Sequence, residues 1–75
     1  MKKCVYVISR CMKVSGEKSI FHFIGYYNGV KIKRIETSSG IKFKTGEEYL
    51  LLIDNIEIKD EILFGSIVKS KRVFI

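Results

Sequence analysis

Residues 19–37 read SIFHFIGYYNGVKIKRIET, and this stretch decides the fold class. Two strand-like runs, at residues 19–27 and 30–37, are separated only by Asn28-Gly29. Asn-Gly suits a two-residue type I′ turn, because both central residues of that turn need positive φ. The sequence therefore predicts a β-hairpin with strands at residues 19–27 and 30–37.

Three further strands are expected on either side of this hairpin. One covers residues 4–14 and reaches the hairpin through the turn-type connection Ser15-Gly16-Glu17-Lys18. The other two cover residues 49–58 and 61–71, with a turn near Lys59-Asp60. Residues 41–46 form a connection of unspecified conformation.

Irregular positions are predicted in three of the five strands. Polarity becomes mixed at Ser9-Arg10 in the first strand, and the alternation changes phase at Arg34-Ile35 in the third. Both patterns are typical of a β-bulge. Gly65 in the last strand marks a bend or a close approach of two backbones.

A helix is the alternative for the fourth segment. Thr45 followed by Glu48 fits a capping box, and apolar residues then share one helical face. Gly46 in the first turn and the alternation of Ile56-Glu57-Ile58 favour a strand instead. Both alternatives remain open at this point.

Composition favours a single β domain. The chain has 75 residues, of which twelve are Ile, and it contains no Ala, Pro, Gln or Trp. Ala is the best helix former, whereas β-branched and aromatic residues suit a half-buried sheet. A small open sheet would expose its edges, so we expect an all-β, five-stranded closed or partly open barrel spanning residues 1–75.

The order of elements resembles that of a small OB-fold domain, in which three meandering strands and a connection precede a terminal hairpin. Four features carry the resemblance: the long, irregular first strand; Asn28-Gly29 between the second and third strands; residues 43–49 (FKTGEEY), which resemble an F-x-x-G-E-x-Y entry into a fourth strand; and residues 65–68 (GSIV), which resemble the start of a closing strand. The region between the third and fourth strands lacks a convincing helix, which leaves an SH3-like barrel as the alternative.

The resemblance implies a binding surface for single-stranded nucleic acid. In OB-folds, the face of the second and third strands and the adjoining loops bind oligonucleotides. The corresponding residues here are Lys18, Tyr26, Tyr27, Lys31, Lys33 and Arg34. Tyr26 and Tyr27 would stack bases, and the four cations would meet phosphates.

The charge distribution agrees with this expectation. The formal net charge is +6, and residues 1–46 hold ten Lys or Arg against two acids. Residues 47–75 hold four Lys or Arg against six acids, and Asp54, Glu57, Asp60 and Glu61 cluster around the last hairpin. That cluster is expected to be a solvated hairpin tip that repels a phosphate backbone.

No catalytic or metal site is predicted. The chain has no Gly-rich phosphate loop, and two Cys with one His do not make up the four ligands of a structural zinc site. Cys4 and Cys11 lie about 23 Å apart on an extended strand and cannot form a disulfide there, so both are expected to be small buried hydrophobes. His22 is expected to be structural, and Phe21 and Phe23 are expected in the core.

We therefore expect a cytoplasmic, non-enzymatic binding module without cofactor or membrane span, whose partner is single-stranded nucleic acid. The alternative is a protein-interaction or assembly module, forming a homodimer or a complex with another protein. Its candidate surfaces are an exposed sheet edge, the acidic hairpin and the apolar end Val73-Phe74-Ile75.

Overall fold

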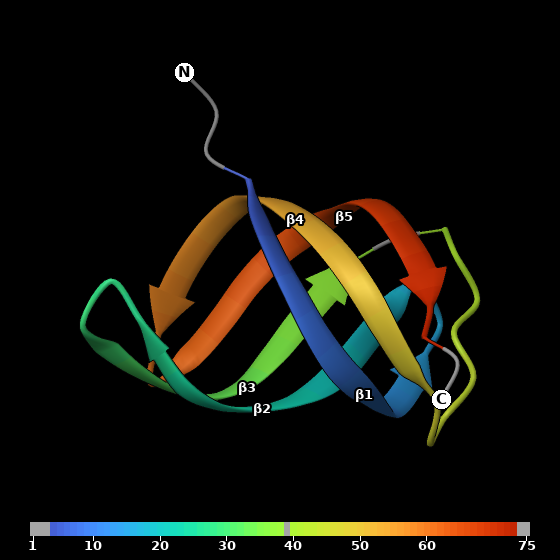
Figure 1. The fold of residues 1–75 in the computed structure, drawn as a ribbon, viewed down its shortest axis with the longest axis horizontal. Helices are drawn as coiled ribbons and strands as arrows, with labels where there is room; N and C mark the ends of the chain where they lie inside the picture. The colour runs from blue at the N-terminus through green and yellow to red at the C-terminus, as the bar shows by residue number, and fades with distance from the viewer. Residues whose placement is uncertain (1–3, 39, 74–75) are drawn as a thin grey trace.

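The computed structural model describes residues 4–38 and 40–73, whose regular structure is entirely β. The strands are β1 (Val5–Ser15), β2 (Lys18–Tyr27), β3 (Val30–Ser38), β4 (Glu48–Lys59) and β5 (Ile62–Arg72). They close into a barrel in the order β1-β2-β3-β5-β4 (Figure 1). Neighbours are antiparallel except β3 and β5, which are parallel. The predicted all-β, five-stranded barrel is confirmed, and the architecture is consistent with a small OB-like or SH3-like barrel.

The predicted hairpin turns are present. Asn28 and Gly29 have φ values of 50° and 79°, as a type I′ turn requires, and β2 and β3 pair directly from Tyr27 and Val30 onward. The second hairpin turns at Asp60-Glu61, where both residues also have positive φ, of 53° and 64°. This turn lies one residue later than the sequence predicted.

The helix alternative for the fourth segment is wrong. Glu48–Lys59 is a strand that pairs with β1 on one side and with β5 on the other. Tyr49, Leu51 and Ile53 are buried and alternate with half-buried residues, so the side-chain period is two. A helix here would leave β1 and β5 each with an unpaired edge and the barrel open.

The irregular positions differ in detail from the predicted ones. In β1 the register shifts between Cys11 and Lys13, and not at Ser9-Arg10. The phase reversal in the third strand is confirmed, because Ile32 and Ile35 are both buried. The ladder accommodates this reversal with an extra residue on β2, between His22 and Gly25.

Gly65 is a point of close approach, as predicted. A Cβ atom built there would lie 2.9 Å from the backbone oxygen of Asp54 and would overlap the Ile53 side chain. At this point β4 carries two residues, Asn55 and Ile56, opposite one residue of β5.

The connection between β3 and β4 covers one end of the barrel with Phe43. Figure 1 shows this connection at the opposite end from the β2–β3 turn. The Phe43 ring packs edge-on against Phe21 at 5.0 Å and against Tyr49 at 4.8 Å between centroids. The backbone N–H of Lys44 donates a hydrogen bond of 2.8 Å to the Tyr49 hydroxyl. The three rings therefore hold the connection onto the barrel without a helix.

The expected core residues are confirmed with one exception. Phe21 and Cys11 are buried in the core, and Phe23 packs against it. Burial raises the pKa of the Cys11 thiol, with a smaller opposing effect from a hydrogen bond with the Lys13 backbone. Both cysteines are free, but Cys4 is exposed, so the expectation that it is buried was wrong.

Candidate nucleic-acid interface

The outward side of the first three strands carries the largest group of exposed apolar side chains. Exposed and inward residues alternate along β1 and β2, which places their outward side chains on adjacent columns. Together with the cations of β3, these residues form the surface that we call the outer face. Its members are Tyr6, Ile8, Arg10 and Met12 from β1, His22, Ile24 and Tyr26 from β2, and Lys31, Lys33 and Arg34 from β3.

Tyr26 and Lys31 form the aromatic and basic pair of the outer face. They are direct partners in the β2–β3 ladder, and Tyr26 is 71% exposed. Directly opposed residues of antiparallel strands have Cβ atoms about 5 Å apart, so the ring and the ammonium group share one part of the surface. Tyr27 lies differently, because it is half-buried and packs against the core.

A row of ionisable side chains crosses the barrel beside this pair. Glu48 of β4 opposes Arg10, Arg10 also opposes His22, and His22 opposes Arg34. His22 is exposed in this row. The row therefore runs from an acidic end at β4 to a basic end at β3.

Two of the predicted phosphate-binding cations are paired with a carboxylate. Glu36 is buried, and its Oε1 lies 2.7 Å from Lys18 Nζ while its Oε2 accepts a bond of 2.9 Å from Arg34 Nε. Lys18 and then Arg34 lower the pKa of Glu36 through these hydrogen bonds, so the carboxylate remains ionised. Lys18 and Arg34 therefore lie close together, and the acid that compensates their charges was not foreseen from the sequence.

The remaining predicted cation, Lys33, lies beside the acidic hairpin. Its backbone N–H donates a bond of 2.8 Å to the Glu61 carbonyl, which brings the Asp60-Glu61 turn against the middle of β3. The negative charges of Asp60 and Glu61 would repel a phosphate backbone on that side of β3. Lys31, which lies nearer the β2–β3 turn, is further along the strand from them.

The outer face contains an open groove of about 630 Å³ between β1 and β2. The groove exists because the pairing of the two strands begins only at Arg10 and His22, while the first half of β1 pairs with β4. At the point of divergence the Ser9 hydroxyl donates a hydrogen bond to the His22 carbonyl. The groove is lined by Ile8, Ser9, Arg10, Met12, His22, Phe23, Ile24 and Glu48.

Sequence reasoning missed the contribution of β1 to this surface. Tyr6 and Ile8 are 68% and 60% exposed, although the surface expected from the sequence included no residue of this strand. The spacing of Tyr6, Ile8, Arg10 and Met12 at every second position was the available signal. This spacing alone does not say which side of the strand faces solvent. That becomes clear only when the alternate residues, Val7, Ser9 and Cys11, are known to point inward.

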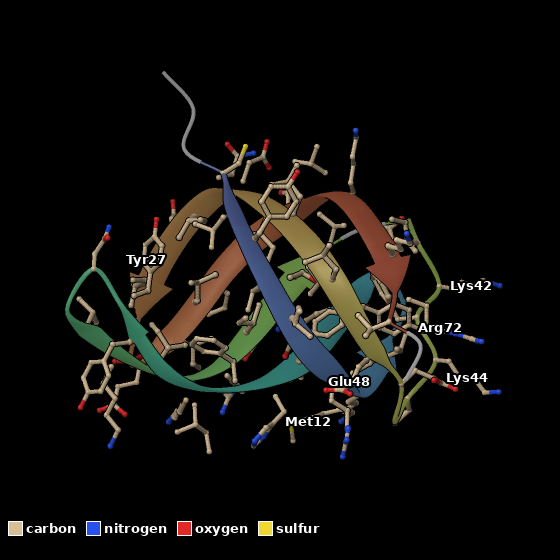
Figure 2. All side chains as sticks on the ribbon, viewed as in Figure 1. Met12, Tyr27, Lys42, Lys44, Glu48 and Arg72 are labelled. Carbon is tan, nitrogen blue, oxygen red and sulfur yellow. The ribbon has the colours of Figure 1, made fainter. Side chains whose placement is uncertain are left out.

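The cations of the first half of the chain do not all gather on the outer face. Figure 2 shows Lys42 and Lys44 at the far end of the barrel, near Arg72, whereas Tyr27 lies at the end with the β2–β3 turn. The charge imbalance between the two halves of the sequence therefore gives two separate basic regions.

Comparison with protein-family models, with curated proteins and with solved structures finds no match. The assignment of a function therefore depends on the chemistry of the surface itself.

Within residues 4–38 and 40–73, no group of three or more His, Cys, Asp or Glu side chains is placed to hold a metal ion. No helix in these ranges is long and apolar enough to span a membrane. What the outer face offers a ligand is exposed rings, aliphatic surface and flanking cations.

Proposed function

We propose that the protein is a non-enzymatic module that binds single-stranded nucleic acid on the outer face. The observation that carries this proposal is the exposed Tyr26 ring directly opposite Lys31. A ring in this position stacks a base, and the ammonium group next to it meets the phosphate of the same nucleotide. Ile24 and Tyr6 extend the apolar surface over which further bases would lie.

The strand plan supports the same proposal. A three-strand meander, a connection and a terminal hairpin that together close one barrel fit the OB-fold, whose second and third strands form an oligonucleotide-binding face. The connection between β3 and β4 departs from the family members that carry a helix there. Here Phe43 fills the corresponding end of the barrel.

Fluorescence anisotropy of labelled oligonucleotides across a salt series tests the proposal. Tyr26→Ala should weaken binding by about 1–3 kcal/mol, the contribution of one stacked base. Val68→Ala, which removes an exposed apolar side chain of β5, should leave the affinity unchanged. The proposal is overturned if the wild-type protein does not bind at low salt, or if both variants bind equally well.

A protein-interaction module is the second candidate, and a specific observation favours it. Ile8, Met12 and Ile24 are aliphatic and at least half exposed, and they have no aromatic face on which a base could stack. Large exposed apolar patches mark protein contacts as well as ligand grooves. Of the earlier candidate surfaces, Phe74 and Ile75 lie outside the described residues. Size-exclusion chromatography with light scattering distinguishes the candidates, because a stable dimer that ignores oligonucleotides supports this one.

A further inference from the structure

A cavity enters the barrel between the diverging strands β1 and β2, next to the outer groove. Its volume is about 190 Å³. The buried side chains of Ile35, Ile53 and Leu63 form its floor, and the exposed rings of Tyr6 and Tyr26 stand among the residues that line it. The half-buried side chains that complete its lining are Val5, Val7, Phe23 and Tyr27. We call it the tyrosine cavity.

An opening of this size and lining is a site for a flat, weakly polar ring. Protein interiors are close-packed and leave few voids larger than a water molecule. An apolar cavity of about 150 Å³ stays dry and takes up benzene. The polar atoms among the side chains that line the tyrosine cavity are the hydroxyls of Tyr6, Tyr26 and Tyr27. A ring that enters therefore meets apolar contacts inside, with hydroxyl groups available nearby.

We propose that the tyrosine cavity receives one pyrimidine base of the bound strand, an inference that rests on the proposed function. Tyr26 belongs to both the cavity and the pair with Lys31, so a base in the cavity leaves its phosphate beside a cation. Thymine and uracil have a C5–C6 edge free of nitrogen and oxygen, whereas both rings of a purine carry nitrogen atoms at their edges, so a pyrimidine suits the apolar floor better. The apolar floor favours entry by the C5-methyl edge of thymine, with the polar groups of the base left toward the mouth.

The C5-methyl group provides a sharp test, because thymine and uracil differ there alone. Oligo(dT) and oligo(dU) of about ten nucleotides lie within the site sizes of small barrels. We expect oligo(dT) to bind about fourfold more tightly, which corresponds to the ~0.8 kcal/mol of one buried CH₂ group. Oligo(dA) should bind more weakly than either, because its base does not enter.

Filling the cavity should abolish this preference. In Val7→Phe the new ring occupies the space, so neither thymine nor uracil can enter. The affinities for oligo(dT) and oligo(dU) should then become equal and fall to that for oligo(dA), while all three still bind through the outer face. Val7→Leu, a smaller change, should reduce the ratio in part if Val7→Phe fails to fold. Val14→Leu is the matched control: Val14 is also half-buried on β1 against the core, but it does not line the cavity.

The outcomes separate this inference from the proposed function. Equal affinities of the wild-type protein for oligo(dT) and oligo(dU), or a ratio that Val7→Phe leaves unchanged, overturn the cavity assignment and leave the outer face as the binding surface. Absence of binding to all three oligonucleotides at low salt overturns both. Dimerisation that Val7→Phe abolishes would assign the cavity to an apolar side chain of a second copy instead.

Discussion

Glu36 lowers the positive charge of the candidate surface, because its buried carboxylate contacts two of the cations of that surface, Lys18 and Arg34. Lys18 reaches it from the first residue of β2, and Arg34 reaches it from two positions earlier on β3. Exposed ion pairs contribute little to stability, but a carboxylate that is only 8% exposed requires partners in order to remain ionised. The two ion pairs therefore hold the side chains of Lys18 and Arg34 in place, and they reduce the positive charge that these two residues offer to a phosphate group.

The lowered pKa of Glu36 predicts an acid-sensitive contribution to stability. A carboxyl group with a lower pKa in the folded than in the unfolded protein stabilises the fold above its ordinary value of about 4.3, and this contribution is lost as the pH falls through the folded value. Glu36→Gln should lower the free energy of unfolding by about 1 kcal/mol at pH 7. The difference from wild type should shrink as the pH falls below about 4.

Urea unfolding of both proteins between pH 7 and strong acid measures this difference. Glu17→Gln is the control, since Glu17 is an exposed acid in the β1–β2 turn and its replacement should change stability by less than about 0.5 kcal/mol. A constant difference between wild type and Glu36→Gln at every pH would contradict the assigned role of the ion pairs.

At the scale of elements, the connection between β3 and β4 has a structural role that its sequence only partly indicated. Phe43 is 6% exposed and contacts the rings of Phe21 and Tyr49. Beyond it, the backbone groups of Gly46 and Glu47 exchange hydrogen bonds of 2.8 and 2.9 Å with Cys11 of β1. One buried ring and a few backbone bonds thus close this end of the barrel.

Phe43→Ala should therefore be among the most destabilising single substitutions. Removing a buried Phe side chain costs about 3–5 kcal/mol, a large part of the roughly 5–15 kcal/mol by which domains are stable. Lys42→Ala, at the exposed neighbouring position, should leave the urea midpoint almost unchanged. Similar midpoints for the two variants would show that the connection does not depend on Phe43.

Most of the strands were predictable from local chemistry, whereas the fourth segment also fitted a helix until its pairing with β1 and β5 was known. Asn28-Gly29 has few conformations other than a tight turn, and alternating apolar residues indicate strands at any position in a chain. The bulge in β1 was misplaced by two to three residues, because its position depends on where the strand leaves β4 for β2. The same divergence creates the tyrosine cavity, which no local pattern indicates.

Candidate site residues were harder to predict, since their roles depend on pairings between distant segments. Tyr26 and Lys31 lie five positions apart around a turn, so their proximity follows from the hairpin itself. Glu36 meets Lys18 only because Lys18 pairs with Ser38 at the far end of the same hairpin. The sequence pattern offered no means of distinguishing a compensated cation from one available to phosphate.

For the whole molecule, the net charge of +6 is divided between separate surfaces. Lys31 and Lys33 lie on β3 at the outer face, whereas Lys69 and Lys71 are exposed on β5 where it pairs with β4. A uniformly attractive protein would bind a polyanion on any of its sides. If binding is localised at the outer face, the affinity should depend on where the lysines lie as well as on the net charge.

Two double variants with the same change in net charge distinguish binding at the outer face from binding on any side of the protein. Lys31→Glu with Lys33→Glu, and Lys69→Glu with Lys71→Glu, lower the net charge by the same amount. If two phosphate contacts are lost from the outer face, the slope of log K against log[salt] for a single strand becomes shallower by about 1.4 in the first variant only. Anisotropy titrations at several salt concentrations measure that slope. Equal changes in both variants would mean that the affinity for the oligonucleotide depends on the total charge of the protein. The lysines of β3 would then have no specific role beside the tyrosine rings of the outer face.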